Sequence, residues 1–487
     1  MPVVSRARLL HWAKPDRGTV GMLSVPTTPL EELAASGTIA AVLREMVLPV
    51  TRGTPAQEAT FLLQIASEVE HAFLLQYLYA AYSLNATTQP VKDAASSFVQ
   101  LAKQEMGHLV TVQNLLRALK QPLYLDREDF PEHPDLYPFP AALDPVSSAS
   151  VAKYVTAEAP PEDQILAPDR DAAARAKAEA ISHLGVIHRV GAIYAIIYWL
   201  FQSGDQPEGP WTLDAGTIAE LTKSYGAGFH IRDTDFAAPD LFARFAAIAN
   251  EWQADDSIFV DPTDPRASAL TAIHKISAQG EGPDSDPSVK SHFEVLVAMY
   301  RDSLPLFPAD AVRDIPTNPH VMPDGSRPSP DPTEISEPLA RAWANLLSAR
   351  YRILLLDILT TLSLDRAAAA ESALRDTVVG WAVDSEMLTF IRKIARLLVT
   401  KQRTSNPAAA GPKYAAAPFT FGDPLPTSMC ELWKEQRALV QRCASLAAQI
   451  TPSTPQETSI LSDMQTFDSG RKATIDDRIQ HLCGPSH

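Results

Sequence analysis

The stretch LAKQEMGHLVTVQNLLRALKQPLYL, residues 101–125, places two side chains of metal-binding type on the apolar face of a predicted helix. In a helix over about residues 91–120, Glu105 and His108 lie one turn apart in a row of otherwise apolar residues. The apolar members of that row are Ala94, Phe98, Leu101, Val112, Leu115 and Leu119. A Glu-x-x-His pair is common by chance on helix surfaces, but an inward-facing pair is typical of carboxylate-bridged di-iron bundles.

The preceding stretch SEVEHAFLLQYLYAAYSL, residues 67–84, shows the same pattern with one carboxylate. A capping box between Thr54 and Gln57, with proline at the first helical position, predicts a helix from there to about residue 84. Glu70 lies on its apolar face, where a carboxylate is costly unless it is paired or bound to a metal. Glu68 lies on the more polar face and is predicted to be solvated. Carboxylate and imidazole ligands together favour iron or manganese over a structural zinc ion.

Composition excludes several classes of protein. The 487 residues carry a formal net charge of −16 and contain no basic run, so the signature of a nucleic-acid-binding protein is missing. The most apolar stretch, residues 190–201, is too short to cross a membrane and predicts a buried helix. Cys430, Cys443 and Cys483 have neither metal-binding spacing nor a disulfide framework. They are therefore predicted to be unpaired thiols in a reducing compartment, the cytoplasm.

Prolines fall in clusters, and the stretches between the clusters predict a mainly α fold with a four-helix bundle and additional C-terminal helices. Helices are expected over about 54–84, 91–120, 171–202, 265–279, 337–364, 367–399 and 429–450, and another begins near residue 289. The expected divisions are an N-terminal extension packed on the bundle (1–54), a metal-binding bundle (55–305), a Pro-rich loop (306–335), a C-terminal helical part (336–455) and a tail (456–487).

Residues 67–84 and 101–125 resemble the ferritin-like family named for iminophenyl-pyruvate dimer synthase, which includes the dimer synthases of the violacein and rebeccamycin pathways. Further similar segments follow in the family's order: YVTAEAPPED (154–163), ISAQGEG (276–282), SHFEVLVAMY (291–300) and AAAGPKYAAAPF (408–419). The likeness spans about residues 55–420. It implies that the bundle is ferritin-like.

The resemblance also implies a ligand set, which is Glu70, Glu105, His108, Glu281 and His292. For the last two, the residues themselves leave alternatives open. Glu281 stands between two glycines at a predicted helix end, where a carboxylate that caps a loop is an equal interpretation. His292 precedes an apolar run, which also fits a buried structural histidine.

One position departs from the family pattern. The family usually has a glutamate in the third helix, and the matching stretch VGAIYAII (190–197) has Ala192 there. Either one metal position is weakened or lost, or another residue substitutes for the glutamate. His188, one turn earlier on the same face, is the candidate substitute. The alternative interpretation of His188 is a structural histidine of the core. Tyr194 and Tyr198 share one face of this helix and either wall a pocket for an aromatic substrate or pack the core.

The function implied by the resemblance is oxidation by one or two non-haem iron ions, with manganese as the alternative metal. Dioxygen or peroxide is the expected oxidant. The expected substrate is a small aromatic amino-acid derivative in bacterial secondary metabolism, and oxidative imine coupling is one candidate reaction. The alternatives are a ferroxidase or iron-binding protein, and a scaffold with a vestigial metal site. A monomer or small homo-oligomer is expected, without nucleic-acid or membrane partners.

Overall fold

The computed structural model describes residues 39–40, 43, 53–127, 139, 141–184, 187, 189–204, 208–252, 264–281, 290–322, 331–406 and 408–484. Within these ranges the chain forms helices and isolated β-bridges but no β-strand, and the expected mainly α fold is confirmed. None of the described helices is long and apolar enough to cross a membrane. The extension expected over residues 1–54 lies almost wholly outside the described residues.

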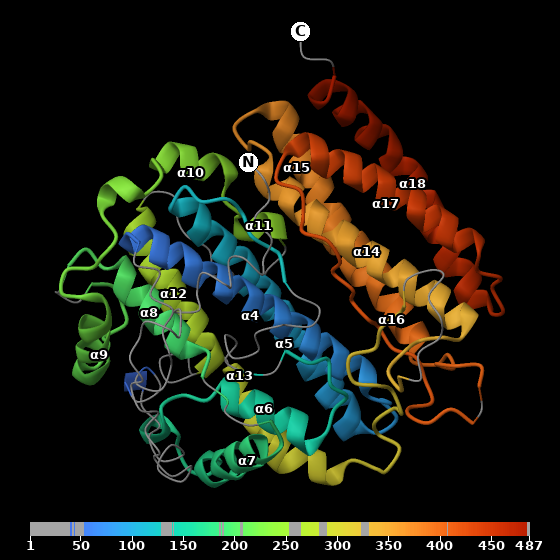
Figure 1. Ribbon diagram of the computed structural model, residues 1–487, viewed down its shortest axis with the longest axis horizontal. Coiled ribbons are helices and arrows are strands. Elements are labelled where there is room, and N and C mark those ends of the chain that lie inside the picture. The colour runs from blue at the N-terminus through green and yellow to red at the C-terminus, as the bar shows by residue number, and fades with distance from the viewer. Residues whose placement is uncertain are drawn as a thin grey trace, which may run out of the picture.

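Four helices form the central bundle (Figure 1). They are α4 (Pro55–Ser83), α5 (Gln89–Ala118), α8 (Gly191–Phe201) and α12 (Pro265–Glu281). Helix α4 packs on α5 and on α8, and α12 closes the ring by contacting both α5 and α8. The capping box of Thr54 starts α4 as expected. The bundle core is therefore enclosed by helices far apart in the sequence.

Two short helices, α6 (Ser148–Ala157) and α13 (His292–Ala298), pack on each other beside the bundle. Helix α7 (Asp169–Leu184) packs on α6. The single helix expected over 171–202 is wrong, because α7 and α8 are separate elements. Their surfaces differ: α7 keeps a polar exposed side, whereas every residue of α8 is buried.

Smaller elements complete the first part of the chain. They are the turns η2 (Glu162–Gln164), η3 (Asp233–Asp235) and η5 (Leu304–Leu306), the π-helical turn η4 (Met299–Ser303), and the helices α9 (Ala215–Tyr225), α10 (Pro239–Phe245) and α11 (Ala249–Trp252).

The C-terminal helices gather beside α4 and α5 in Figure 1. They are α14 (Pro338–Ser363), α15 (Ala369–Gly380), the π-helical segment η6 (Trp381–Ile391), α16 (Arg392–Leu398), α17 (Met429–Ala448) and α18 (Pro455–Leu482). The tail expected over 456–487 is mostly helix α18, which starts at a capping box on Thr454 and packs on α17. Ile460, Met464 and Ile475 form its buried apolar face.

Two of the three cysteines are bonded to each other. Cys430, near the start of α17, and Cys483, at the end of α18, form a disulfide with Cα atoms 5.4 Å apart. The prediction that they are unpaired is wrong, because the antiparallel pair of helices brings residues 53 positions apart together. Cys443 is a free, buried thiol as expected. The cysteines therefore no longer imply a reducing compartment.

Candidate metal centre

Glu70 on α4 and Glu105 and His108 on α5 form a buried group whose ligand atoms lie within 4.8 Å of one another. His108 Nδ1 lies 3.2 Å from Glu70 Oε2 and 3.1 Å from Glu105 Oε2. Helices α4 and α5 pack side by side, and the spacing of three residues puts Glu105 and His108 on one face of α5. The structure brings together the three residues that the helical patterns single out.

A second buried group shares Glu105 and adds Glu158 and His292. His292 Nδ1 lies 3.0 Å from Glu105 Oε1 and 3.3 Å from Glu158 Oε1. Glu158 is the residue that ends α6, and His292 is the first residue of α13. Sequence reasoning missed Glu158 as a candidate ligand. The available signal was its place in YVTAEAPPED, directly before Ala-Pro-Pro, where a helix has to end.

Glu105 links the two groups, because Oε2 faces His108 and Oε1 faces His292. The five residues are at most 3% exposed, and the two imidazole rings stack with centroids 5.5 Å apart. Glu105 Oε1 is buried, and the contact that compensates its charge is the 3.0 Å ion pair with His292 Nδ1, a role that a bound cation could also fill. Hard oxygen donors and imidazoles around a shared carboxylate fit iron or manganese.

Each outer carboxylate accepts a hydrogen bond from one tyrosine. Tyr194 on α8 donates its hydroxyl proton to Glu70 Oε1, and Tyr77 on α4 donates to Glu158 Oε1 at 2.8 Å. Both tyrosines are fully buried. These bonds fix the orientation of the carboxylates from behind, as outer-shell partners of metal ligands do.

The last turn of α12 contacts both groups. Gln279 Oε1 accepts a hydrogen bond from His108 Nε2 at 2.7 Å. At the next residue, Gly280, a Cβ atom would lie 2.7 Å from Glu158 Oε2. The lack of a side chain at Gly280 therefore leaves room for the Glu158 carboxylate in its observed position, and a Cβ there would displace it. In the Gln-Gly pair of ISAQGEG, the Gln279 side chain thus contacts His108 of the first group. The missing side chain of Gly280 leaves space for Glu158 of the second group.

Residues 63–301, which contain all of these side chains, match a ferritin-like family model. They form a ferritin-like domain. Comparisons with curated proteins and with solved structures gave no match. The finer resemblance to the dimer synthases stays a prediction.

Burial and charge shift the titration of the site in this ferritin-like domain. Burial, and then the charge of Glu105, raise the pKa of Glu70 to about 8. Burial also disfavours ionised Glu105, but the positive charge of His292 and the hydrogen bond of His108 outweigh it and hold the pKa of Glu105 below its usual range. Burial disfavours the imidazolium of His292, yet Glu105 and Glu158 raise its pKa to about 9. A cation that binds here must therefore displace protons.

Two expected ligands of the ferritin-like domain cannot be placed. His188 lies outside the described residues, as does the side chain of Glu281, whose backbone ends α12. Both remain predictions. Ala192 is buried in α8, and Glu158 on α6 supplies a carboxylate to the centre that Ala192 cannot.

The cavity beside the ligands is small, about 10 Å³, which holds about one water-sized molecule. Its wall includes Val190, Gly191, Tyr194 and Ile276. Tyr198 does not line it; the Tyr198 hydroxyl donates to a backbone carbonyl and accepts the backbone N–H of residue 211. Of the two interpretations of Tyr198, the structure supports packing in the core.

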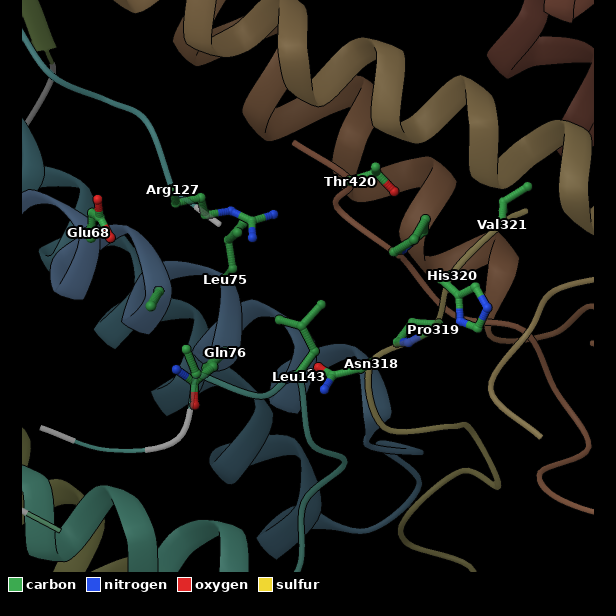
Figure 2. Close-up of a pocket in the computed structure, with 13 residues that line it drawn as sticks. Glu68, Leu75, Gln76, Arg127, Leu143, Asn318, Pro319, His320, Val321 and Thr420 are labelled. Carbon is green, nitrogen blue, oxygen red and sulfur yellow. Dashed lines mark hydrogen bonds between the residues drawn. The ribbon is translucent and has the colours of Figure 1, made fainter. Parts of the chain in front are cut away.

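A larger cavity of about 150 Å³ lies on the other face of α4 (Figure 2). Figure 2 shows Glu68 and Arg127 at one end and Asn318 and His320 toward the other. Glu68 is half-buried and accepts a 2.7 Å hydrogen bond from the Tyr124 hydroxyl, so it is less exposed than a fully solvated carboxylate. The two cavities share no lining residue, and this one is separate from the metal centre.

Proposed function

We propose that the chain is a non-haem iron oxidoreductase whose ferritin-like domain binds two ions. The observation that carries this proposal is the pair of buried Glu-Glu-His groups that share Glu105. The proposed ligands are Glu70, Glu105, His108, Glu158 and His292. When bound, iron would supply open coordination positions for the activation of dioxygen or peroxide.

The protein's own side chains prepare the site in two ways. Tyr194 and Tyr77 hold Glu70 and Glu158 in place, so little reorganisation is needed when a ligand binds. The apolar helix faces around the cluster keep bulk water out, which protects a reactive oxidant from side reactions. The small cavity leaves space for a water or a molecule of similar size.

The proposed substrate is a small aromatic amino-acid derivative, with oxidative imine coupling in bacterial secondary metabolism as the candidate reaction. The ordered similar segments over about residues 55–420 support this proposal. An aromatic ring does not fit the described cavity of about 10 Å³. The proposal therefore requires that the wall formed by Val190, Gly191 and Ile276 opens for the substrate.

The small cavity favours a second candidate, the oxidation of ferrous ions themselves. That reaction needs room for metal ions and a small oxidant only, which agrees with a cavity the size of one water molecule. The carboxylate-rich ligand set suits both candidates equally.

Anaerobic titration with ferrous iron tests the metal centre. Wild-type protein should bind about two equivalents of ferrous iron, and Glu70→Ala about one. Glu105→Ala should bind neither ion tightly, because Glu105 belongs to both groups. Glu68→Ala is the matched control: it removes a carboxylate from the other face of the same helix and should keep both ions. Full iron binding by Glu105→Ala would contradict the proposed ligands. If the wild-type protein binds no iron, the remaining candidate is a scaffold with a vestigial metal site.

Turnover separates the two reactions. Iron-loaded protein is supplied with arylpyruvate imines, made in situ by an amino-acid oxidase, and the products are analysed by mass spectrometry. Dimeric or oxygenated products that disappear in Glu105→Ala support the leading proposal. No turnover of any aromatic amino acid, arylpyruvate or imine, together with rapid aerobic oxidation of ferrous iron, selects the ferroxidase.

A further inference from the structure

The outer ring nitrogens of the two site histidines are held differently. His108 Nε2 donates a hydrogen bond to Gln279 Oε1 at 2.7 Å. His292 Nε2 is buried and has no hydrogen-bond partner among the residues that the structure describes, and the residue is 1% exposed. The two histidines therefore differ on the side of the ring that points away from the carboxylates.

The rest of the two groups is closely matched. Each histidine turns Nδ1 toward Glu105 and toward one outer carboxylate, at distances between 3.0 and 3.3 Å. Each outer carboxylate, Glu70 or Glu158, accepts one tyrosine hydroxyl. Among these contacts, the one with Gln279 has no counterpart in the second group.

This contact matters for metal binding because a histidine ligates through one nitrogen and is oriented through the other. An acceptor at Nε2 keeps the proton on that atom and leaves the lone pair of Nδ1 directed at the carboxylates. Gln279 supplies the acceptor to His108 from the last turn of α12. A neutral His292 that coordinates through Nδ1 must instead carry an unsatisfied, buried Nε2–H, at a cost of about 1–3 kcal/mol.

We propose that Gln279 is a positioning residue that makes the group of Glu70, Glu105 and His108 bind its ion more tightly, and therefore first. The group with Glu158 and His292 fills second and exchanges its ion more readily. This inference rests on the proposed function, to which it adds the order of loading and a residue that sets it.

The two groups can be measured one at a time with cobalt(II), whose visible absorption reports binding. We call the group of Glu70, Glu105 and His108 the His108 group, and the group of Glu105, Glu158 and His292 the His292 group. Glu158→Ala disables the His292 group, so cobalt binding in that background reports the His108 group. Glu70→Ala disables the His108 group and reports the His292 group. Gln279→Met, which has similar length but only a weakly accepting thioether sulfur, should weaken metal binding by the His108 group about 10–100-fold. Gln279→Glu restores an acceptor and should stay within a few-fold of the parent. Neither change should affect the His292 group.

A second measurement reports the hydrogen bond itself. In cobalt-loaded protein, the ring N–H of each bound histidine gives a shifted proton NMR signal that disappears on exchange with heavy water. One signal should exchange slowly because Gln279 holds His108 Nε2–H. That signal should exchange faster in Gln279→Met and remain slow in Gln279→Glu, while circular dichroism shows that both variants stay folded.

Equal affinities of the two groups in the parent backgrounds would overturn the inference, as would equal weakening of both by Gln279→Met. Neither result would contradict the proposed function, provided that Glu105→Ala still fails to bind either ion. Weakening of the His108 group alone, with rescue by Gln279→Glu, establishes the role of Gln279.

Discussion

Glu105 is the residue on which the whole centre depends, because its two oxygens face two different histidines. The neighbouring imidazoles hold its pKa down, so it stays ionised in a fully buried position. Burial, and then the like charge of Glu105, raise the pKa of Glu70 instead, although His108 lies beside it. The same residue type thus has opposite protonation behaviour within one site.

Gly280→Ala should separate fold stability from metal binding. The added Cβ meets the flexible end of Glu158, not backbone, so the carboxylate moves and the helix is kept. Replacing a helical glycine by alanine also favours α12 by up to about 1 kcal/mol. We expect unchanged or higher thermal stability with weaker cobalt binding by the His292 group. Gly107→Ala on α5, where a Cβ meets nothing within 4 Å, is the control and should leave binding unchanged.

Periodicity found the residues that lie inside long helices and missed those at helix ends. Glu70, Glu105 and His108 interrupt apolar rows, so their burial could be predicted. Glu158 caps the C-terminus of a ten-residue helix, α6, and has no row to interrupt. Gln279 is a neutral side chain, and only the position of α12 against His108 gives it a role.

At the scale of elements, the long helices were predictable. Helices α4, α5, α12, α14 and α17 begin and end within two residues of the expected positions. Helix α18 was missed, because a helix that buries one narrow face against a single partner has few apolar residues. The Pro-poor stretch that was expected to be one third helix divides into α7 and α8, which bury different surfaces.

A buried charge network joins three of the C-terminal elements. Arg350 on α14 donates to Glu386 on η6 at 2.7 Å, and Arg471 on α18 donates to the same carboxylate at 2.9 Å. Arg471 also donates to Asp357 on α14 at 2.7 Å. All four side chains are fully buried. Their mutual pairing compensates charges that would otherwise be too costly to bury.

Arg471→Met should therefore destabilise the protein strongly. It leaves Glu386 and Asp357 buried with one partner fewer, and breaking such a pair costs about 3–5 kcal/mol. Urea unfolding measures the change as a lower midpoint. Arg437→Met is the control, since Arg437 forms only a long, half-exposed pair with Asp476 at 3.9 Å, and its midpoint should hardly move. Equal effects of the two changes would show that the network adds no stability.

The disulfide between Cys430 and Cys483 should stabilise the pair formed by α17 and α18. It closes a loop between residues 53 positions apart. The loss of chain entropy in the unfolded state is then worth about 4 kcal/mol. Cys430→Ser should lower the unfolding midpoint, and dithiothreitol should lower the midpoint of the wild-type protein but not that of the variant. A reductant effect of equal size in both proteins would mean that this bond contributes nothing.

For the whole molecule, the C-terminal helices are not an independent addition to the ferritin-like domain. The Tyr351 hydroxyl on α14 lies 2.6 Å from His71 Nε2 on α4, and Arg117 on α5 donates to the backbone carbonyl of Leu362 on α14 at 2.6 Å. His71 follows the proposed ligand Glu70 directly in the sequence. Helix α4 therefore carries a proposed metal ligand on one face and the contact with the C-terminal part on another. The Pro-rich loop expected over residues 306–335 therefore connects two parts, the bundle and the C-terminal helices, that pack directly on each other.

The pH dependence of stability should weaken or reverse when metal is bound. The pKa of Glu70 rises from 4.5 to about 8 on folding, and that of His292 from 6.5 to about 9. Both groups hold protons more tightly in the folded state. The contribution of Glu70 to the free energy of unfolding is therefore lost as pH rises from about 4.5 to 8. The contribution of His292 is lost as pH rises from about 6.5 to 9. Each proton retained only by the folded state costs about 1.4 kcal/mol per pH unit over that window.

We therefore expect the melting temperature of metal-free protein, kept in chelator, to fall between pH 6.5 and 9. A bound cation displaces these protons, so metal affinity rises over the same window and the metal-loaded protein should lose less stability or gain some. Glu70→Gln removes one titrating group and should flatten the metal-free curve. A metal-free melting temperature that rises with pH, or a Glu70→Gln curve as steep as that of the parent, would mean that these carboxylates and imidazoles do not hold the protons assigned to them.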